Sequence, residues 1–229
     1  MKVGIMQPYF FPYIGYYQLI HEVDIFVIYD DVNFIKQGWI SRNRILLNQA
    51  PHFLTLELKG ASSFKKINEI ETGNNKLKIL KTLELNYKKA PCFADTYAVM
   101  QEILSSEEVN LARFLAQSLI KINQFLGIQT RVLVSSDLEK GNELKGADKV
   151  LHICKTLQAN QYINAIGGQE LYSKEVFAGQ GLDLHFLKTN PITYSQWNGE
   201  FVPWLSIIDV MMFNTPETIR TMLSNYELV

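Results

Sequence analysis

Short apolar runs alternate with segments of helical spacing in two stretches of the chain, and this alternation constrains the fold more than any other feature. Near the start, the strand-like runs 3–6 and 25–29 flank a segment of helical spacing, 13–21. After Gly127 the alternation returns with the strand-like runs 131–134, 162–164 and 182–187 and the helical segments 149–157 and 169–178. Such an order is typical of parallel βαβ units with right-handed crossovers.

The segments between and after these stretches have other patterns. Arg44–Leu47 and Phe53–Leu58 flank turn-forming residues, which predicts an antiparallel hairpin. The leucine spacing between residues 75 and 125 predicts three helices that end at Gly127. Thr215-Pro216 is typical of the start of a last helix, with a capping residue followed by a proline in the first turn.

We therefore predict an α/β fold with an open, mostly parallel, doubly wound (Rossmann-like) sheet, a β-hairpin and a helical insert. Residues 1–74 would form the N-terminal part of the α/β domain with the hairpin, and residues 75–127 a helical insert or lid. Residues 128–229 would form the C-terminal part of the same structural unit.

Composition narrows the classes of function. The 229 residues carry a formal net charge of -1, which disfavours nucleic acid as the main partner, although a charged tRNA stays open as a donor. The apolar runs are too short to span a bilayer, and Met1-Lys2 leads into a strand rather than a signal core, so we expect a cytoplasmic protein with no membrane partner. Cys92 and Cys154 stand far apart, and no metal site is expected. The oligomeric state stays open.

Five polar segments follow predicted strands. In open parallel sheets, ligands bind where the loops after the strands converge. The segments are Gln7–Pro12, Asp30-Asp31, 135–137, 164–168 and 188–190. Strand ends also need polar turn residues, so each loop alone has a purely structural interpretation. Their convergence favours a binding site.

The first of these loops combines prolines, aromatic rings and a glycine. Prolines hold the rings rigidly, which suits stacking on a base or sugar ring, although the rings would equally plug the core. A glycine in the following helix would allow a ligand to approach the helix N-terminus. The predicted binding residues here are Gln7, Pro8, Tyr9, Tyr13, Gly15 and Tyr16.

Candidates for acid–base chemistry and charge stabilisation follow the second strand. Asp30 and Asp31 would hold a hydroxyl, an amine or an ion, unless one merely caps the turn. The loop 36–44 supplies cations, an indole and an amide, which suit the binding of a phosphate and a ring. The alternative is a solvated basic loop without a role in binding. The candidate site residues in this loop are Lys36, Trp39, Arg42 and Asn43. His21 is the histidine nearest to this predicted site, as a base or as a helix cap.

Later strand ends add further candidates. Ser135 and Ser136 offer hydroxyls for phosphate oxygens. Asn164, Gly167 and Gly168 precede a predicted helix whose free amides would hold an anion, but they lack the spacing of a dinucleotide or Walker motif. Asp209 lies in a mostly apolar segment, so we expect it to be partnered, either facing the site or holding Arg42.

Five motifs resemble those of the WbqC-like family of bacterial O-antigen and surface-polysaccharide clusters. They are "IMQPYFFPYIGYYQLI", "DIFVIYDDVNFIKQGWISRNRI", "NYKKAP", "YINAIGG" and "FVPWLSIIDVMMFN", and they cover essentially the whole chain. The resemblance implies an enzyme that transfers glycine, or another amino acid, onto the amine of a nucleotide-linked amino sugar. A sugar nucleotide and an amino-acid donor would then be its partners.

Such an amide-forming reaction would use Asp30 or Asp31 as base and Lys36, Arg42 or Asn43 as donors. No cofactor is certain: ATP would activate the carboxylate, or an aminoacyl donor would supply it. A looser resemblance to nucleotidyl transferases leaves an adenylating enzyme open, although Tyr13 and Tyr16 replace the histidines of the HxGH signature. A non-catalytic sugar-nucleotide binding protein is the other alternative.

Overall fold

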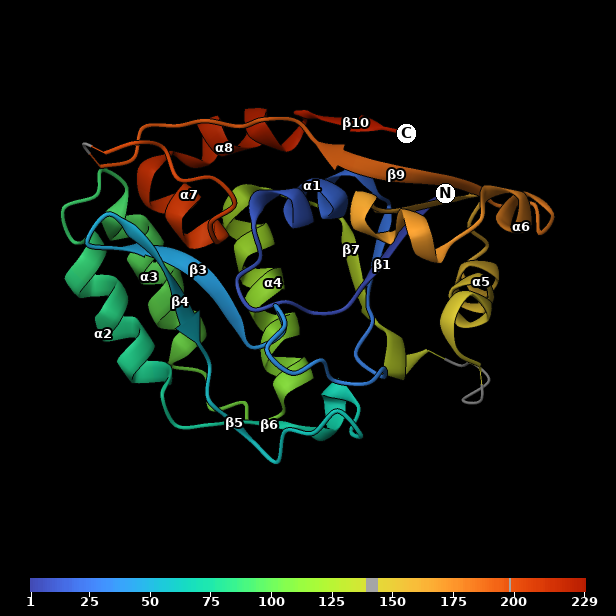
Figure 1. The fold of residues 1–229 in the computed structure, drawn as a ribbon, viewed down its shortest axis with the longest axis horizontal. Helices are drawn as coiled ribbons and strands as arrows, with labels where there is room; N and C mark the ends of the chain where they lie inside the picture. The colour runs from blue at the N-terminus through green and yellow to red at the C-terminus, as the bar shows by residue number, and fades with distance from the viewer. Residues whose placement is uncertain (139–143, 198) are drawn as a thin grey trace.

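A computed structural model describes residues 1–138, 144–197 and 199–229. The chain forms a six-stranded sheet in the order β10-β9-β8-β1-β2-β7 (Figure 1). Five strands are parallel, and β10 runs antiparallel to β9 at one edge. The strands are β1 (Lys2–Met6), β2 (Ile25–Ile28), β7 (Arg131–Val134), β8 (Gln161–Ala165), β9 (Asp183–Thr189) and β10 (Tyr226–Leu228). The predicted α/β class and mostly parallel sheet are confirmed.

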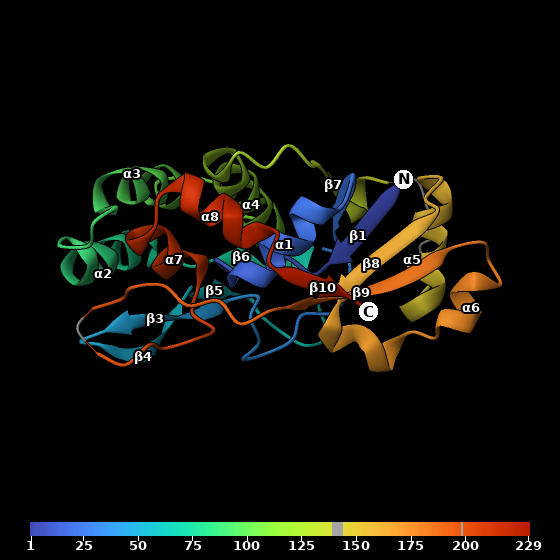
Figure 2. The same cartoon turned by 90° about the horizontal axis from the view of Figure 1, so that it is seen from above.

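Helices cover both faces of this sheet (Figure 2). On one face, Phe26 and Ile163 pack in a core cluster with residues of α1 (Ile14–Glu22), α4 (Leu111–Leu126), α7 (Ile207–Phe213) and α8 (Pro216–Leu223). On the other face, Val3 and Val27 pack in a second cluster with residues of α5 (Gly146–Thr156) and α6 (Lys174–Ala178). Because side chains alternate along a strand, β2, β8 and β9 each supply buried residues to both clusters.

The segment between β2 and β7 contains the predicted hairpin and three helices. The helices are α2 (Lys76–Tyr87), α3 (Phe93–Leu104) and α4, which ends at Gly127 in the left-handed conformation, φ 73°. The hairpin strands are β3 (Arg42–Leu47) and β4 (Ala50–Thr55), so the expected second strand, Phe53–Leu58, lay too far along the chain. Asn48 and Gln49, with φ of 50° and 65°, make a two-residue turn and leave Pro51 within the strand. A short pair, β5 (Leu58–Lys59) and β6 (Glu71–Thr72), follows.

One predicted helix is broken in two. Residues 166–171 form a 3-10 helix, and α6 begins separately at Lys174. Ser173 accepts a hydrogen bond from the Val176 backbone N–H at 3.3 Å, which makes it the N-cap of a new helix and explains the break.

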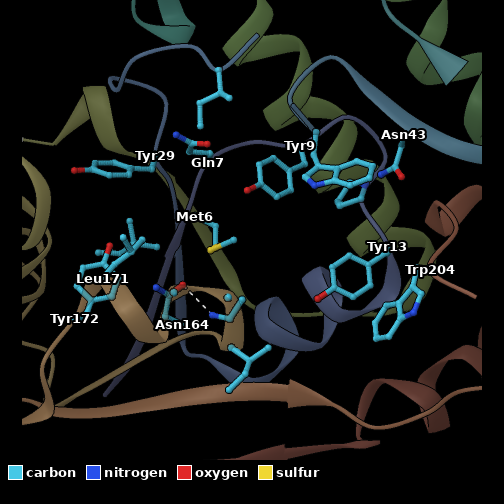
Figure 3. Close-up of a pocket in the computed structure, with 18 of the residues that line it drawn as sticks. Met6, Gln7, Tyr9, Tyr13, Tyr29, Asn43, Asn164, Leu171, Tyr172 and Trp204 are labelled. Carbon is cyan, nitrogen blue, oxygen red and sulfur yellow. Dashed lines mark hydrogen bonds between the residues drawn. The ribbon is translucent and has the colours of Figure 1, made fainter. Parts of the chain in front are cut away.

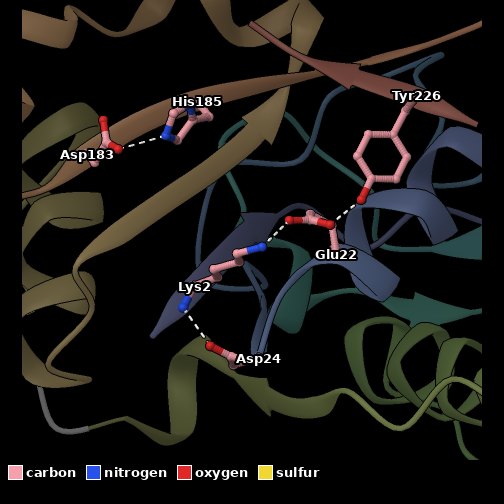
Figure 4. A network of polar contacts seen from close by, with 6 residues as sticks. All are labelled: Lys2, Glu22, Asp24, Asp183, His185 and Tyr226. Atoms are coloured by element: carbon pink, nitrogen blue, oxygen red, sulfur yellow. Dashed lines mark hydrogen bonds and ion pairs between the residues drawn. The ribbon is translucent and has the colours of Figure 1, made fainter. Parts of the chain in front are cut away.

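Polar contacts fix the C-terminal end of α1 (Figure 4). Glu22, its last residue, accepts contacts from the Lys2 ammonium group and the Tyr226 hydroxyl, and so joins α1 to β1 and β10. The Lys2 backbone N–H donates to Asp24 at 2.7 Å. The opposite, N-terminal end of α1 is thereby held in a defined position at the carboxyl ends of the strands.

Candidate functional site

A cavity of about 740 Å³ opens at the carboxyl ends of β1 and β8 (Figure 3). The chain leaves β1 toward β2 and returns on its other side with β8, so this is the point where the strand order reverses and where open α/β sheets bind ligands. Of the predicted site residues, the cavity is lined by Gln7, Tyr9, Tyr13, Trp39, Asn43, Asn164, Gly167 and Gly168, of which Asn43 was predicted as a catalytic donor. Further lining residues are Ile5, Met6, Pro12, Tyr29, Ile35, Arg44, Ala165, Ile166, Leu171, Tyr172 and Trp204.

The loop after β1 divides its aromatic rings between the core and the cavity. Phe10 and Phe11 are fully buried, so the plug interpretation holds for these two rings, whereas Tyr9 lines the cavity. Asn43 holds the loop, because its amide donates to the carbonyls of Phe10 at 3.2 Å and Phe11 at 2.9 Å. The Ser206 hydroxyl donates to the Phe11 carbonyl as well, at 2.7 Å.

Tyr13 lies directly over the first turn of α1. A Cβ on Gly15 would stand 2.4 Å from the Tyr13 ring and equally close to the Thr189 hydroxyl. The glycine therefore makes room for this ring rather than for a ligand. Tyr16, one turn from Tyr13, is buried and donates to the Gln7 carbonyl at 2.8 Å, so it supports the loop and does not line the cavity. Pro8 is also buried and does not line the cavity.

The carboxyl end of β8 contributes a fixed amide group, that of Asn164. Asn164 is 5% exposed, and its side-chain oxygen accepts a hydrogen bond from the Ala165 backbone N–H at 2.8 Å (Figure 3). Its amide nitrogen lies against Gly168, where an added Cβ would stand only 2.4 Å away. An added Cβ on Gly167 would meet nothing within 4 Å. The two glycines therefore have different roles. The absence of a side chain at Gly168 leaves the space that the Asn164 amide occupies, whereas Gly167 faces open space.

The hairpin and the segment before α7 close the opposite wall. Arg44 of β3 lines the cavity, and its guanidinium donates to the Trp204 carbonyl at 3.2 Å. Within the described part of the chain, Arg44 has no carboxylate partner, and its Nε is buried without a hydrogen bond. Trp204 packs edge-on against Tyr13, with ring centroids 5.9 Å apart. The sequence analysis included Arg44 in the basic loop 36–44 without choosing it as a site residue, and it missed Trp204 as a lining residue, although both lie in the quoted motifs.

The predicted carboxylates form a network that joins the loops after β2 and β7. Asp30 accepts hydrogen bonds from the Ser136 backbone N–H at 2.9 Å and from its hydroxyl at 2.6 Å. Asp31 accepts from the Ser135 hydroxyl at 2.8 Å and pairs with the buried Lys149 ammonium group at 2.9 Å. None of these groups lines the cavity, but Tyr29, directly before Asp30, does. The network therefore positions the wall of the cavity.

Four further predicted site residues also lie away from the cavity wall. His21 is exposed in the last turn of α1, about 12 Å along the helix from Tyr13. Lys36 is exposed, and the Arg42 guanidinium lies over the Phe53 ring at 4.3 Å. Asp209 is fully buried, as its apolar surroundings suggested. Its partners are not Arg42 but the hydroxyls of Tyr87 and Tyr194, both at 2.7 Å, and the Gln196 amide at 3.1 Å.

Comparison with known proteins shows to which family the chain belongs. The model of the WbqC-like protein family matches residues 7–221. The chain belongs to the WbqC-like family. A relative from Mycobacterium tuberculosis (strain ATCC 25618 / H37Rv), "Uncharacterized protein Rv1507c", is 30% identical over 218 residues, which is 93% of each chain. The search of solved structures returned no significant match.

Among the residues that the structure describes, the titratable groups that line the cavity of this WbqC-like protein are phenols and one guanidinium. Burial raises the pKa of Tyr9, Tyr13, Tyr29 and Tyr172 above the ordinary value, and the neighbouring Asp31 carboxylate adds to the rise at Tyr29. The four hydroxyls therefore keep their protons at neutral pH and are available as hydrogen-bond donors. Together with Arg44, they favour binding of an anionic ligand that carries rings.

Two further properties concern the described residues as a whole. These residues contain no cluster of three or more histidine, cysteine or acidic side chains that would hold a metal ion. Within the same ranges, no helix has both the length and the apolar character needed to cross a bilayer.

Proposed function

We propose that this WbqC-like protein transfers an amino acid, with glycine as the expected one, onto the amine of a nucleotide-linked amino sugar for O-antigen or other surface-polysaccharide synthesis. The observation that carries the proposal is a cavity of substrate size at the reversal of strand order, lined by aromatic rings and one arginine. Membership of the WbqC-like family supports the same substrate class.

The lining groups match the parts of a sugar nucleotide. The Arg44 guanidinium suits the diphosphate, since it lines the cavity with donors to spare beyond the Trp204 carbonyl. Tyr9 and Trp39 offer ring faces for a base or a sugar. Gln7 and Asn164 offer amide groups for sugar hydroxyls or for the acceptor amine.

The transfer step makes one bond and breaks another. The amine nitrogen of the sugar bonds to the carbonyl carbon of the activated amino acid. The bond from that carbon to its oxygen leaving group breaks with its electron pair, and the proton of the amine passes to the departing oxyanion. Protonated phenols such as Tyr9 and Tyr13 would donate hydrogen bonds to the negative charge that develops on the carbonyl oxygen.

A specific observation favours a second candidate, a non-catalytic sugar-nucleotide binding protein. Among the described residues, no carboxylate, histidine or cysteine lines the cavity, so a conventional general base is lacking there. Asp30 and Asp31, the expected bases, are engaged by Ser136, Ser135 and Lys149 instead. Under the transfer proposal, the donor's own leaving group takes the proton.

One experiment separates the two candidates. The protein is incubated with a UDP-linked amino-deoxyhexose and with glycine, supplied either with ATP or as glycyl-tRNA, and the sugar nucleotide is analysed by mass spectrometry. A product heavier by one glycyl group supports transfer. Tight binding of the sugar nucleotide, which is then recovered unchanged with both donors, would establish the binding protein and refute transfer.

Arg44→Gln tests the assignment of the cavity in either case. Loss of charged hydrogen bonds to the diphosphate is expected to weaken binding of the sugar nucleotide by about 10- to 150-fold in calorimetry. Arg131→Gln is the matched control, because Arg131 is an exposed arginine of β7 that does not line the cavity. Equal affinities of the two variants would contradict the assignment.

A further inference from the structure

A second cavity of about 730 Å³ adjoins the first. The two cavities share Tyr13, Ile166 and Trp204 in their walls, so these side chains form the partition between them. Tyr13 and Trp204 lie next to each other on one side of the first cavity (Figure 3). A group bound in one cavity is thus separated from a group bound in the other only by the thickness of this partition.

The wall of the second cavity is mainly apolar and aromatic. Tyr194 and Phe201, from the segment between β9 and α7, contact each other edge to face with centroids 5.2 Å apart. Pro191, Pro203 and Trp204 add further flat apolar faces. Flat aromatic and proline faces suit a planar ring, because every nucleic acid base has a π-face on which they can stack.

Hydrogen bonds fix this aromatic wall without any ligand. The buried Asp209 carboxylate accepts from the Tyr194 hydroxyl at 2.7 Å and from the Gln196 amide at 3.1 Å. Gln196 also holds Val202, the neighbour of Phe201. The Gln196 side-chain amide donates to the Val202 carbonyl at 3.0 Å, and its side-chain oxygen accepts from the Val202 backbone N–H at 2.8 Å. Asp209 is therefore a positioning residue for the rings, and a ligand finds them already ordered.

We propose that this second cavity binds the nucleoside of the activated amino-acid donor, with adenosine as its chemical class. The inference rests on the proposed function for the identity of the transferred group. A glycyl group alone fills only a small part of the cavity, so its size indicates that the donor is bound through its carrier. Adenosine is common to a glycyl-adenylate and to the 3′ end of glycyl-tRNA.

The partition then marks the place where the two substrates meet. With the sugar nucleotide in the first cavity and the nucleoside in the second, the glycyl carbonyl reaches the acceptor amine beside Tyr13 and Trp204. Trp204 has a φ of 60°, a conformation that is costly for a bulky residue. The Arg44 contact with its carbonyl helps to hold it there, so the phosphate-binding arginine also supports the partition.

Calorimetry with a stable probe tests the assignment. The probe is 5′-O-(N-glycylsulfamoyl)adenosine, titrated into the protein with and without a UDP-linked amino-deoxyhexose. Phe201→Ala is expected to weaken probe binding about tenfold or more and to leave the affinity for the sugar nucleotide unchanged. Leu171→Ala is the matched control for probe binding, because Leu171 lines the first cavity and not the second.

Unchanged probe affinity in Phe201→Ala would overturn the inference, and so would displacement of the probe by the sugar nucleotide. Should that variant not fold, the wild-type protein still tests the inference, because two separate cavities predict that one probe molecule and one sugar nucleotide bind to the protein at the same time.

If the probe binds together with the sugar nucleotide but no glycyl sugar forms, the transfer proposal fails while the nucleoside site stands. If transfer occurs and Phe201→Ala changes neither probe affinity nor the KM for either donor, the nucleoside site alone fails. When it stands, the donor whose KM rises in Phe201→Ala identifies the natural source, ATP-activated glycine or glycyl-tRNA.

Discussion

Two adjacent glycines after β8 allow a sharp test of how the cavity wall is built. In Gly168→Ala, the new methyl group would stand 2.4 Å from the Asn164 amide nitrogen and 3.1 Å from its Cγ. In Gly167→Ala, nothing lies within 4 Å of the methyl group. Neither glycine has a positive φ, so alanine is compatible with both backbone conformations. The two variants thus add the same atom, one into a filled space and one into an open space.

The cost of Gly168→Ala follows from the displaced amide. Asn164 is buried, and moving it breaks the hydrogen bond that its oxygen accepts from the Ala165 N–H. A buried polar group without its partner costs about 1–3 kcal/mol. For a chain of this size, each kcal/mol lowers the melting temperature by about 2–4 °C, so we expect a decrease of about 2–12 °C.

Thermal melts and sugar-nucleotide titrations of both variants check this reasoning. Gly167→Ala is expected to melt within about 2 °C of wild type, since a substitution into open space changes stability by about 0.5 kcal/mol at most. Gly168→Ala is also expected to bind the sugar nucleotide more weakly, because Asn164 lines the cavity. Equal melting temperatures for the two variants would refute the role assigned to Gly168.

Two further predictions concern buried charge. Lys149→Met removes one partner of the buried pair with Asp31, and breaking a buried pair should lower the free energy of unfolding in urea by about 3–5 kcal/mol. Lys188→Met, in an exposed pair, should lower it by less than about 1 kcal/mol, and similar losses in the two variants would contradict the network. Burial raises the pKa of Asp209, so this carboxyl keeps its proton in the folded state at pH values at which it has lost the proton in the unfolded state. The free energy of unfolding therefore falls as the pH rises from about 4 through the raised pKa. Asp209→Asn should remove this slope from the melting temperature measured against pH, and an unchanged slope would assign the titration to another group.

Periodicity predicted most of the fold, because the parallel strands are buried on both faces and appear as continuous apolar runs. Ile25–Ile28, with all four residues buried, is an example. The end of the hairpin turn was misplaced because positive φ values at Asn48 and Gln49 are not visible in residue type alone. A glutamine in this conformation is uncommon, and proline at position 51 suggested a longer loop.

The candidate site was predicted in part. The loop rule placed Gln7, Tyr9 and Asn164 at the cavity, since it depends only on strand direction. Local sequence could not reveal that Asp31 pairs with Lys149, which is 118 residues away in the chain. Trp204 was likewise out of reach, because only the packing of the segment after β9 against α1 brings it to Tyr13.

The position of β1 inside the sheet has a consequence for synthesis on the ribosome. β1 pairs with β2, which follows it closely, but its other edge pairs with residues 161–163 of β8. At about 5–20 residues per second, that edge waits on the order of 10 s for its partner to be translated. An unpaired edge of apolar strand is a template for association with other chains. Fragments that end before β8 are therefore expected to aggregate, and the nascent chain to depend on chaperones until β8 emerges.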